Sequence, residues 1–146
     1  MVKKEITSII MKLYLYADMC KMIHYSTKKY HAHKQADDIR DCILEFVDKL
    51  AEQSFGFLGL PNFNDFSLRV PVKKTNDLSE LCKNVFNLVS TLQDKLNNKK
   101  YSGIISLIDD FKGELSNLVY LNMFDKVSDK KINETINKVL KEFIHE

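Results

Sequence analysis

The segment His33–Glu52, "HKQADDIRDCILEFVDKLAE", decides the fold because it carries two stripes of side chains at helical spacing. At about 100° per residue, its apolar residues share one sector of a helical wheel. These residues are Ile39, Cys42, Ile43, Phe46 and Leu50. The opposite side carries His33 and five acidic residues: Asp37, Asp41, Glu45, Asp48 and Glu52. The segment therefore predicts an amphipathic helix with an almost wholly acidic polar face.

Apolar residues recur at the same spacing elsewhere and predict further helices. We expect a helix over residues 5–26, a second that follows a tight connection and runs to about 54, a third from about 76 to 97, a fourth over 102–124 and a short last one over 129–145. Residues that commonly cap helix N-termini precede or open the later helices. They are Ser26 or Thr27 for the second helix, Thr75 or Asn76 for the third, Ser102 for the fourth and Ser128 for the last.

The connections between these helices are short, long and short. The long one has about twenty residues, both prolines and two of the four glycines, which suits a crossover along the length of a bundle. We expect Phe55, Phe57, Phe63 and Phe66 to pack beneath it. The predicted fold is all-α: a ferritin-like four-helix bundle with one long crossover between its second and third helices, plus an extra C-terminal helix. The chain is one domain, residues 1–146, with the bundle at about 5–124.

Composition narrows the function classes. The net charge is +2 and only two of the 22 basic residues are Arg, which disfavours sequence-specific DNA recognition. Cys20, Cys42 and Cys82 lack metal-knuckle spacing and fall on apolar helix faces, so we expect reduced core cysteines and a cytoplasmic protein. Charged residues interrupt the apolar N-terminal stretch, so we expect neither a signal peptide nor a membrane span.

The acidic stripe has two explanations. It is either an ordinary solvated face or a metal site. Like charges four residues apart repel each other along a helix unless a cation neutralises them. His33 and Asp37 form one pair at that spacing, and Asp48 and Glu52 form another. Asp37 and Asp48 are eleven residues apart, or about 16 Å along a helix. The two pairs can therefore share one ion only in a two-fold antiparallel dimer, which has two equivalent sites.

The pattern His33-x3-Asp37-x10-Asp48-x3-Glu52, preceded by His24, resembles the Dps family of mini-ferritins. The following "VDKLAEQSFGFLG" is also similar to that family. The resemblance implies an inter-subunit ferroxidase site. His24, His33 and Asp37 of one subunit would form one half of the site, and the partner's Asp48 and the partner's Glu52 the other half. It further implies a homo-oligomer, a dimer at least and a dodecameric shell at most.

The sequence departs from Dps proteins in one place. His24 lies nine residues before His33, not the twelve usual in that family, and Tyr25 stands where a Trp is usual. The shorter spacing is more similar to a phage and giant-virus family of Dps-like domains without an established function. The resemblance covers roughly residues 7–124 and implies a viral protein of the host cytoplasm or the virion.

The resemblance implies that the chain oxidises Fe(II) with oxygen or peroxide, stores iron and protects against oxidative damage. Iron suits a His and carboxylate set, and zinc or manganese fits the same residues. One alternative is a viral structural or interaction protein that keeps the fold without the chemistry. Another is DNA compaction through Lys3, Lys4 and the Lys-rich last helix, which would be salt-sensitive.

A few other residues are weaker candidates. His31 faces away from His33 on a helix and would be at most an auxiliary ligand, and His145 is a residue of the solvated tail. Asp110 and Glu114 form another pair at i,i+4 spacing, which we interpret as a solvated face. Tyr14, Tyr16 and Tyr25 are either redox traps or packing residues.

Overall fold

Four α-helices form the chain in the computed structural model, which describes the backbone of residues 2–144 and the side chains of residues 2–121 and 134–143. They are α1 (Val2–Ser26), α2 (Tyr30–Leu58), α3 (Leu78–Lys95) and α4 (Ser102–Ile144). Two short 3-10 helices, η1 (Phe63–Asp65) and η2 (Lys99–Tyr101), lie in the connections. No strand occurs among residues 2–144, so the all-α prediction is confirmed.

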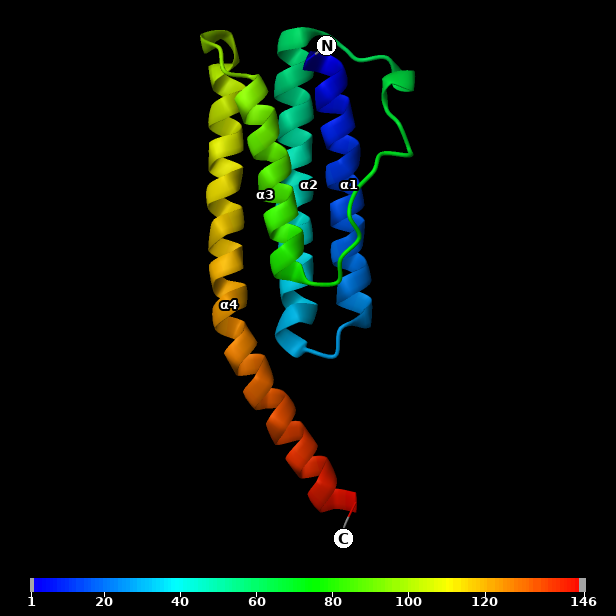
Figure 1. Ribbon diagram of the computed structural model, residues 1–146, viewed down its shortest axis with the longest axis vertical. Coiled ribbons are helices and arrows are strands. Elements are labelled where there is room, and N and C mark those ends of the chain that lie inside the picture. The colour runs from blue at the N-terminus through cyan, green and yellow to red at the C-terminus, as the bar shows by residue number, and fades with distance from the viewer. Residues whose placement is uncertain (1, 145–146) are drawn as a thin grey trace.

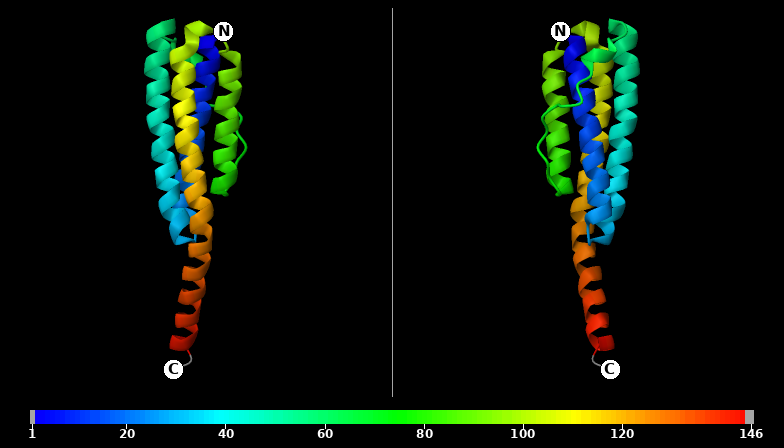
Figure 2. Two further views of the ribbon diagram at one scale, coloured as in Figure 1. Left: turned by 90° about the vertical axis from the view of Figure 1, so that its left-hand side faces the viewer. Right: turned by 90° about the vertical axis from the view of Figure 1, so that its right-hand side faces the viewer.

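The four helices pack side by side (Figures 1 and 2). In Figure 1, α1 runs downward and α2 returns upward beside it. The long connection then descends to the lower end, so α3 runs upward in the same direction as α2. Finally α4 descends against α2 and α3. The order of short, long and short connections is the one that the sequence predicts.

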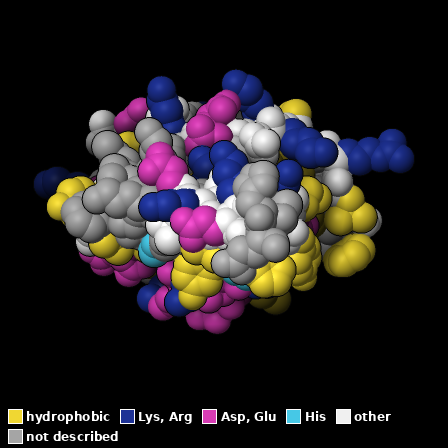
Figure 3. Space-filling model, turned by 90° about the horizontal axis from the view of Figure 1, so that it is seen from below, with side chains coloured by type: hydrophobic (Ala, Val, Ile, Leu, Met, Phe, Trp, Pro, Cys, Tyr) yellow, Lys and Arg dark blue, Asp and Glu magenta, His cyan; other side chains and the backbone are white. Residues whose placement is uncertain are grey.

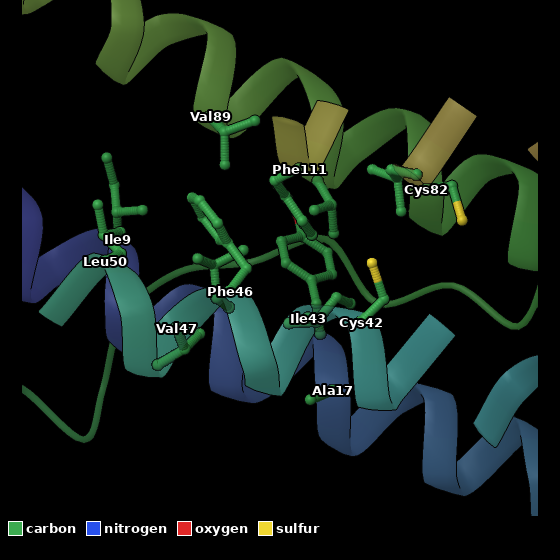
Figure 4. Close-up of a cluster of buried hydrophobic side chains, with 14 of the residues drawn as sticks. Ile9, Ala17, Cys42, Ile43, Phe46, Val47, Leu50, Cys82, Val89 and Phe111 are labelled. Carbon is green, nitrogen blue, oxygen red and sulfur yellow. The ribbon is translucent and has the colours of Figure 1, made fainter. Parts of the chain in front are cut away.

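The core lies between the apolar faces of the helices (Figure 4). On α2, the predicted positions Ile39, Ile43, Phe46 and Leu50 are all buried. The ring of Phe46 stacks on that of Phe111 from α4, with centroids 4.0 Å apart and an angle of 9° between the planes. This burial of aromatic and branched side chains is the main driving force for the bundle.

The three cysteines belong to this core, as predicted. Cys20, Cys42 and Cys82 are all free and buried, and they come from three different helices. Burial raises the pKa of each thiol to about 12. Since the thiolate is the reactive form, these cysteines behave as small apolar side chains.

Two of the predicted helix caps are wrong. The N-cap of α2 is Lys29, which makes no side-chain capping bond, because Ser26 ends α1 and donates its hydroxyl to the carbonyl of Met22. The N-cap of α3 is Asp77, whose carboxylate accepts from the backbone N–H of Ser79 at 2.9 Å. An ionised carboxylate suits the positive end of the helix dipole. The start of α4 at Ser102 is as predicted.

The prediction of a separate C-terminal helix is also wrong. Residues 102–144 form one continuous helix, and Ser128 does not start a new one. The reason is that no Gly or Pro follows Gly113, and Ser and Asp alone rarely end a helix. The lower part of α4 projects beyond the other three helices (Figure 1). Four of its apolar side chains are exposed: Ile136, Val139, Leu140 and Phe143.

The crossover has about the predicted length, residues 59–77, but it begins later than predicted because α2 continues to Leu58. Phe55 of α2 packs edge-to-face on Phe66 of the crossover, with centroids 6.4 Å apart. However, Phe57 and Phe63 are exposed, so only half of the predicted aromatic packing occurs. Among the described residues, no helix has the length and apolarity needed to cross a membrane.

Candidate functional site

Two histidines meet at the lower end of the bundle, where α1 ends and α2 begins. His24 is in the last turn of α1 and His33 is in the first turn of α2. Their rings stack with centroids 3.7 Å apart and an angle of 20° between the planes. Histidine side chains reach the surface at this end (Figure 3). The short link between the helices is what brings the two rings together.

Each of these rings is oriented by the backbone of the other residue. The Nδ1 atom of His24 lies 2.6 Å from the carbonyl oxygen of His33. The Nδ1 atom of His33 lies 2.7 Å from the carbonyl oxygen of His24. A carbonyl oxygen only accepts hydrogen bonds, so both Nδ1 atoms carry the proton. In a neutral ring the lone pair is therefore on Nε2. Metal-binding histidines are commonly oriented in this way, with one ring nitrogen bound to the metal and the other donating a hydrogen bond.

Asp37 lies one turn after His33 and completes this cluster. Its Oδ1 accepts a hydrogen bond from Nζ of Lys21 at 3.1 Å. Its Oδ2 is 3.4 Å from Nδ1 of His24. The hydrogen bond from Lys21 holds the pKa of Asp37 below its ordinary value, and the positive charges of Lys21 and Arg40 lower it further. We call Lys21, His24, His33 and Asp37 the histidine end of the site.

Asp48 and Glu52, which we call the acidic end, lie farther up the same helix. Both are exposed, and neither has an ion pair with another described residue. Eleven residues of unbroken α2 separate Asp37 from Asp48, or about 16 Å at 1.5 Å per residue. The structure thus brings His24, His33 and Asp37 together and leaves Asp48 and Glu52 apart from them. Within residues 2–121 and 134–143, no three His, Cys, Asp or Glu side chains are close enough to hold a metal ion.

The two weaker histidine candidates are His31 and His145. The ring of His31 lies edge-on to that of Tyr30, with centroids 5.7 Å apart. His145 is outside the described residues. Of the three candidate tyrosines, Tyr16 is buried while Tyr14 and Tyr25 are exposed.

A groove of about 400 Å³ between α2 and α4 is a feature that the sequence did not predict. It is bordered by Glu45 and Lys49 of α2 and by Asp110 and Glu114 of α4. At its base, Sγ of Cys42 donates to Oε2 of Glu114 at 3.5 Å. Lys49 pairs with Glu45 at 3.0 Å, and this bond raises the pKa of Lys49. The pair Asp110 and Glu114 is visible in the sequence, but its position opposite Glu45 depends on how α4 packs.

A family model matches residues 24–121, from His24 through the acidic end and on into α4. The chain belongs to the Family of unknown function (DUF5856). The match covers about two thirds of this DUF5856 chain and includes all five candidate ligands. No curated protein and no solved structure matches the chain. The functional proposal for this DUF5856 chain therefore rests on its own residues.

Proposed function

We propose that this DUF5856 chain is a ferritin-like protein that oxidises Fe(II) at a site shared between two copies. The histidine end supplies one half of the site, and the partner's Asp48 and the partner's Glu52 supply the other half. Zinc and manganese compete for the same ligands. Storage of the oxidised iron follows if the copies assemble further into a closed shell.

The course of the chain supports a ferritin-like bundle. In that arrangement one long crossover makes the second and third helices parallel, whereas hairpin connections alone make neighbours antiparallel. Here α2 and α3 run in the same direction and the crossover spans the bundle (Figure 1). Many helical proteins share such a course, so the side chains have to carry the function.

The observation that carries the proposal is the stack of His24 on His33 beside Asp37. His24 lies only nine residues before His33, and its ring nevertheless lies against that of His33. The link is short, and the reciprocal Nδ1 bonds to carbonyl oxygens fix both rings. Two imidazoles with free Nε2 atoms and a carboxylate one turn away are donor types that suit Fe(II), and they would have to move closer together to bind one ion.

The chain's own residues have defined tasks in this proposal. His24 and His33 bind through Nε2, and Asp37 binds only after Lys21 gives up its hydrogen bond to Oδ1. Lys21 therefore holds the place of a cation and keeps Asp37 ionised when no metal is bound. The partner's Asp48 and the partner's Glu52 add two negative charges, which favour the more highly charged oxidised iron.

The first test measures Fe(II) oxidation by absorbance under air or peroxide. We expect wild type to oxidise iron faster than buffer, and His24→Ala and Asp48→Ala to be slow. Asp41→Ala is the matched control, since Asp41 is an acidic residue of the same helix with a side chain that is 76% exposed. If all variants oxidise iron at the rate of buffer, the proposed function is wrong.

A mixing experiment tests whether the site is shared. His24→Ala and Asp48→Ala subunits are unfolded together and refolded as a mixture. A mixed dimer combines both defects in one site and leaves the other site intact, so about a quarter of the wild-type activity should return. If each site lay within one chain, mixing two inactive variants would restore nothing.

One observation favours a second function, that of an interaction protein without metal chemistry. The projecting part of α4 exposes Ile136, Val139, Leu140 and Phe143 at helical spacing. Apolar side chains in that pattern suit contact with another helix. This alternative predicts that a Phe143→Ser variant loses a partner while iron oxidation in wild type stays at the rate of buffer. Of the residues that the DNA-compaction alternative would use, Lys3 donates a hydrogen bond from Nζ to the carbonyl of Leu60.

A further inference from the structure

Tyr14 lies in the middle of the surface where α1 and α2 meet. Lys21 on α1 contacts Asp37 on α2. The two helices are antiparallel, so a step of seven residues back along α1 from Lys21 reaches Tyr14, and the same step forward along α2 from Asp37 reaches Leu44. Tyr14 and Leu44 therefore lie at the same height in the bundle. Seven residues are close to two turns, so Tyr14 and Leu44 lie on the same faces as Lys21 and Asp37. We call the surface formed by Lys21, Asp37, Tyr14, Leu44 and Asp48 the seam.

The seam has an apolar middle and charged ends. Tyr14 is 40% exposed and Leu44 is half-buried against the core. Asp48 is eleven residues, close to three turns, from Asp37 and thus on the same side of α2. An apolar centre within a polar rim is the usual composition of an interface between proteins.

The charges of the seam specify its occupant as a second copy in antiparallel orientation. One end has the cation of Lys21 and the imidazoles of His24 and His33. The other end has the unpaired carboxylates of Asp48 and Glu52. An antiparallel copy brings each acidic end to the other copy's histidine end, whereas a parallel copy would place carboxylates against carboxylates.

This pairing sets the position of the two-fold axis. For Asp37 to lie level with the partner's Asp48, the axis must cross α2 midway between these two positions, at Cys42 and Ile43. Tyr14, which is level with Leu44, is then about one and a half residues from the axis, so it and the partner's Tyr14 differ in height by about 4.5 Å. The two exposed phenol rings thus meet at the centre of the dimer.

We propose that Tyr14 is an oxidation site at which two copies become covalently joined as dityrosine. Each phenol loses one electron and one proton. The two radicals then form a carbon–carbon bond between ring positions next to the hydroxyls, and the displaced ring protons restore the phenols. Hydrogen peroxide accepts the two electrons with two protons and becomes two molecules of water. This inference rests on the pairing in the proposed function but not on its iron chemistry.

The test uses a metal-independent one-electron oxidant, photoactivated ruthenium tris-bipyridyl with persulfate. Persulfate takes the two electrons and becomes two sulfate ions. We expect wild type to give dimers that survive denaturing gels and show dityrosine fluorescence. Tyr14→Phe should lose both signals while light scattering still reports a dimer. Tyr120→Phe is the control, since Tyr120 is more exposed than Tyr14 but lies on α4.

Two results would overturn the inference. One is a Tyr14→Phe protein that cross-links as well as wild type, and the other is a dimeric wild type that forms no dityrosine. A cross-link through Tyr14 in a protein that does not oxidise iron would support the inference and reject the proposed function. Dityrosine after Fe(II) and peroxide, lost in Tyr14→Phe, would support both.

Discussion

The two ends of the acidic stripe on α2 differ in how they are paired. At the histidine end, every polar group of Asp37 has a neighbour, with Lys21 on one oxygen and His24 near the other. At the acidic end, Asp48 and Glu52 face solvent. The helix pattern is the same in both places, but only one end has a second helix that supplies side chains. The difference shows that a periodic stripe does not by itself define a site.

The apolar face of α2 packs into the core along the length of the helix that carries both ends. A substitution on this face should have the largest effect on the free energy of unfolding. Phe46→Ala removes the ring that stacks on Phe111. Truncation of a buried Phe costs about 3–5 kcal/mol of the free energy of unfolding. Urea denaturation followed by circular dichroism measures this loss. A loss below about 1 kcal/mol would mean that the two ends do not depend on a common core.

Metal affinity compares the two ends directly. If they form one shared site, His33→Ala and Glu52→Ala should weaken Zn²⁺ binding to a similar degree, by roughly tenfold or more. Asp41→Ala should bind as wild type does. Calorimetric titration of the protein with Zn²⁺ measures all three. An effect of His33→Ala without any effect of Glu52→Ala would place the metal at the histidine end alone.

Lys21→Met removes the ion pair between Lys21 and Asp37 at the histidine end, which has no counterpart at the acidic end. The pKa of Asp37 is lowered in the folded chain. The ion pair of Lys21 and Asp37 therefore stabilises the fold at pH values above the ordinary Asp pKa of about 3.9. This stabilisation is lost as the pH falls through the lowered pKa. In Lys21→Met we expect the pKa of Asp37 to rise and this acid dependence to shrink. Carboxyl NMR titration measures the pKa.

The same variant has an opposite effect on metal binding. Without Lys21, Asp37 needs no displacement, so Zn²⁺ should bind more tightly than to wild type. Lys12→Met, which alters a Lys elsewhere on α1, should change neither the pKa of Asp37 nor Zn²⁺ binding. Weaker Zn²⁺ binding by Lys21→Met would show that Lys21 supports the ligands rather than competing with the metal.

The smallest expected effect concerns charge repulsion at the acidic end. Asp48→Asn removes a like-charge pair at i,i+4 spacing, which should stabilise a dilute monomeric chain by about 0.2–0.5 kcal/mol. Asp37→Asn should instead destabilise it, because it weakens the contact with Lys21. Urea unfolding at low salt measures both. High salt should reduce both effects, since the carboxylates are exposed.

Much of the fold is predictable from the sequence because it depends on local pattern. The apolar positions of α2 are buried as their spacing requires, and the long connection is unmistakable from its prolines and glycines. The caps at Lys29 and Asp77 and the continuity of α4 were not predictable, because several residues compete as caps and Ser128 is tolerated within a helix. Such competition is decided by tertiary packing.

The candidate site divides in the same way. The sequence pairs His33 with Asp37 by spacing within one helix. It does not reveal that Lys21 holds Asp37, or that the two imidazoles stack, because those contacts depend on the register between α1 and α2. Nor does it reveal the groove between α2 and α4, which brings together residues about seventy positions apart.

The length of α4 has a hydrodynamic consequence. Its 43 residues extend about 65 Å, whereas a compact chain of this size has a radius of gyration of only about 15 Å. A rod-like projection of this kind increases friction, so a single copy should elute early from a sizing column and sediment slowly. A monomer would then have the elution volume of a larger globular protein. The number of copies on which the proposed shared site depends is therefore best measured by light scattering or native mass spectrometry, which report mass independently of shape.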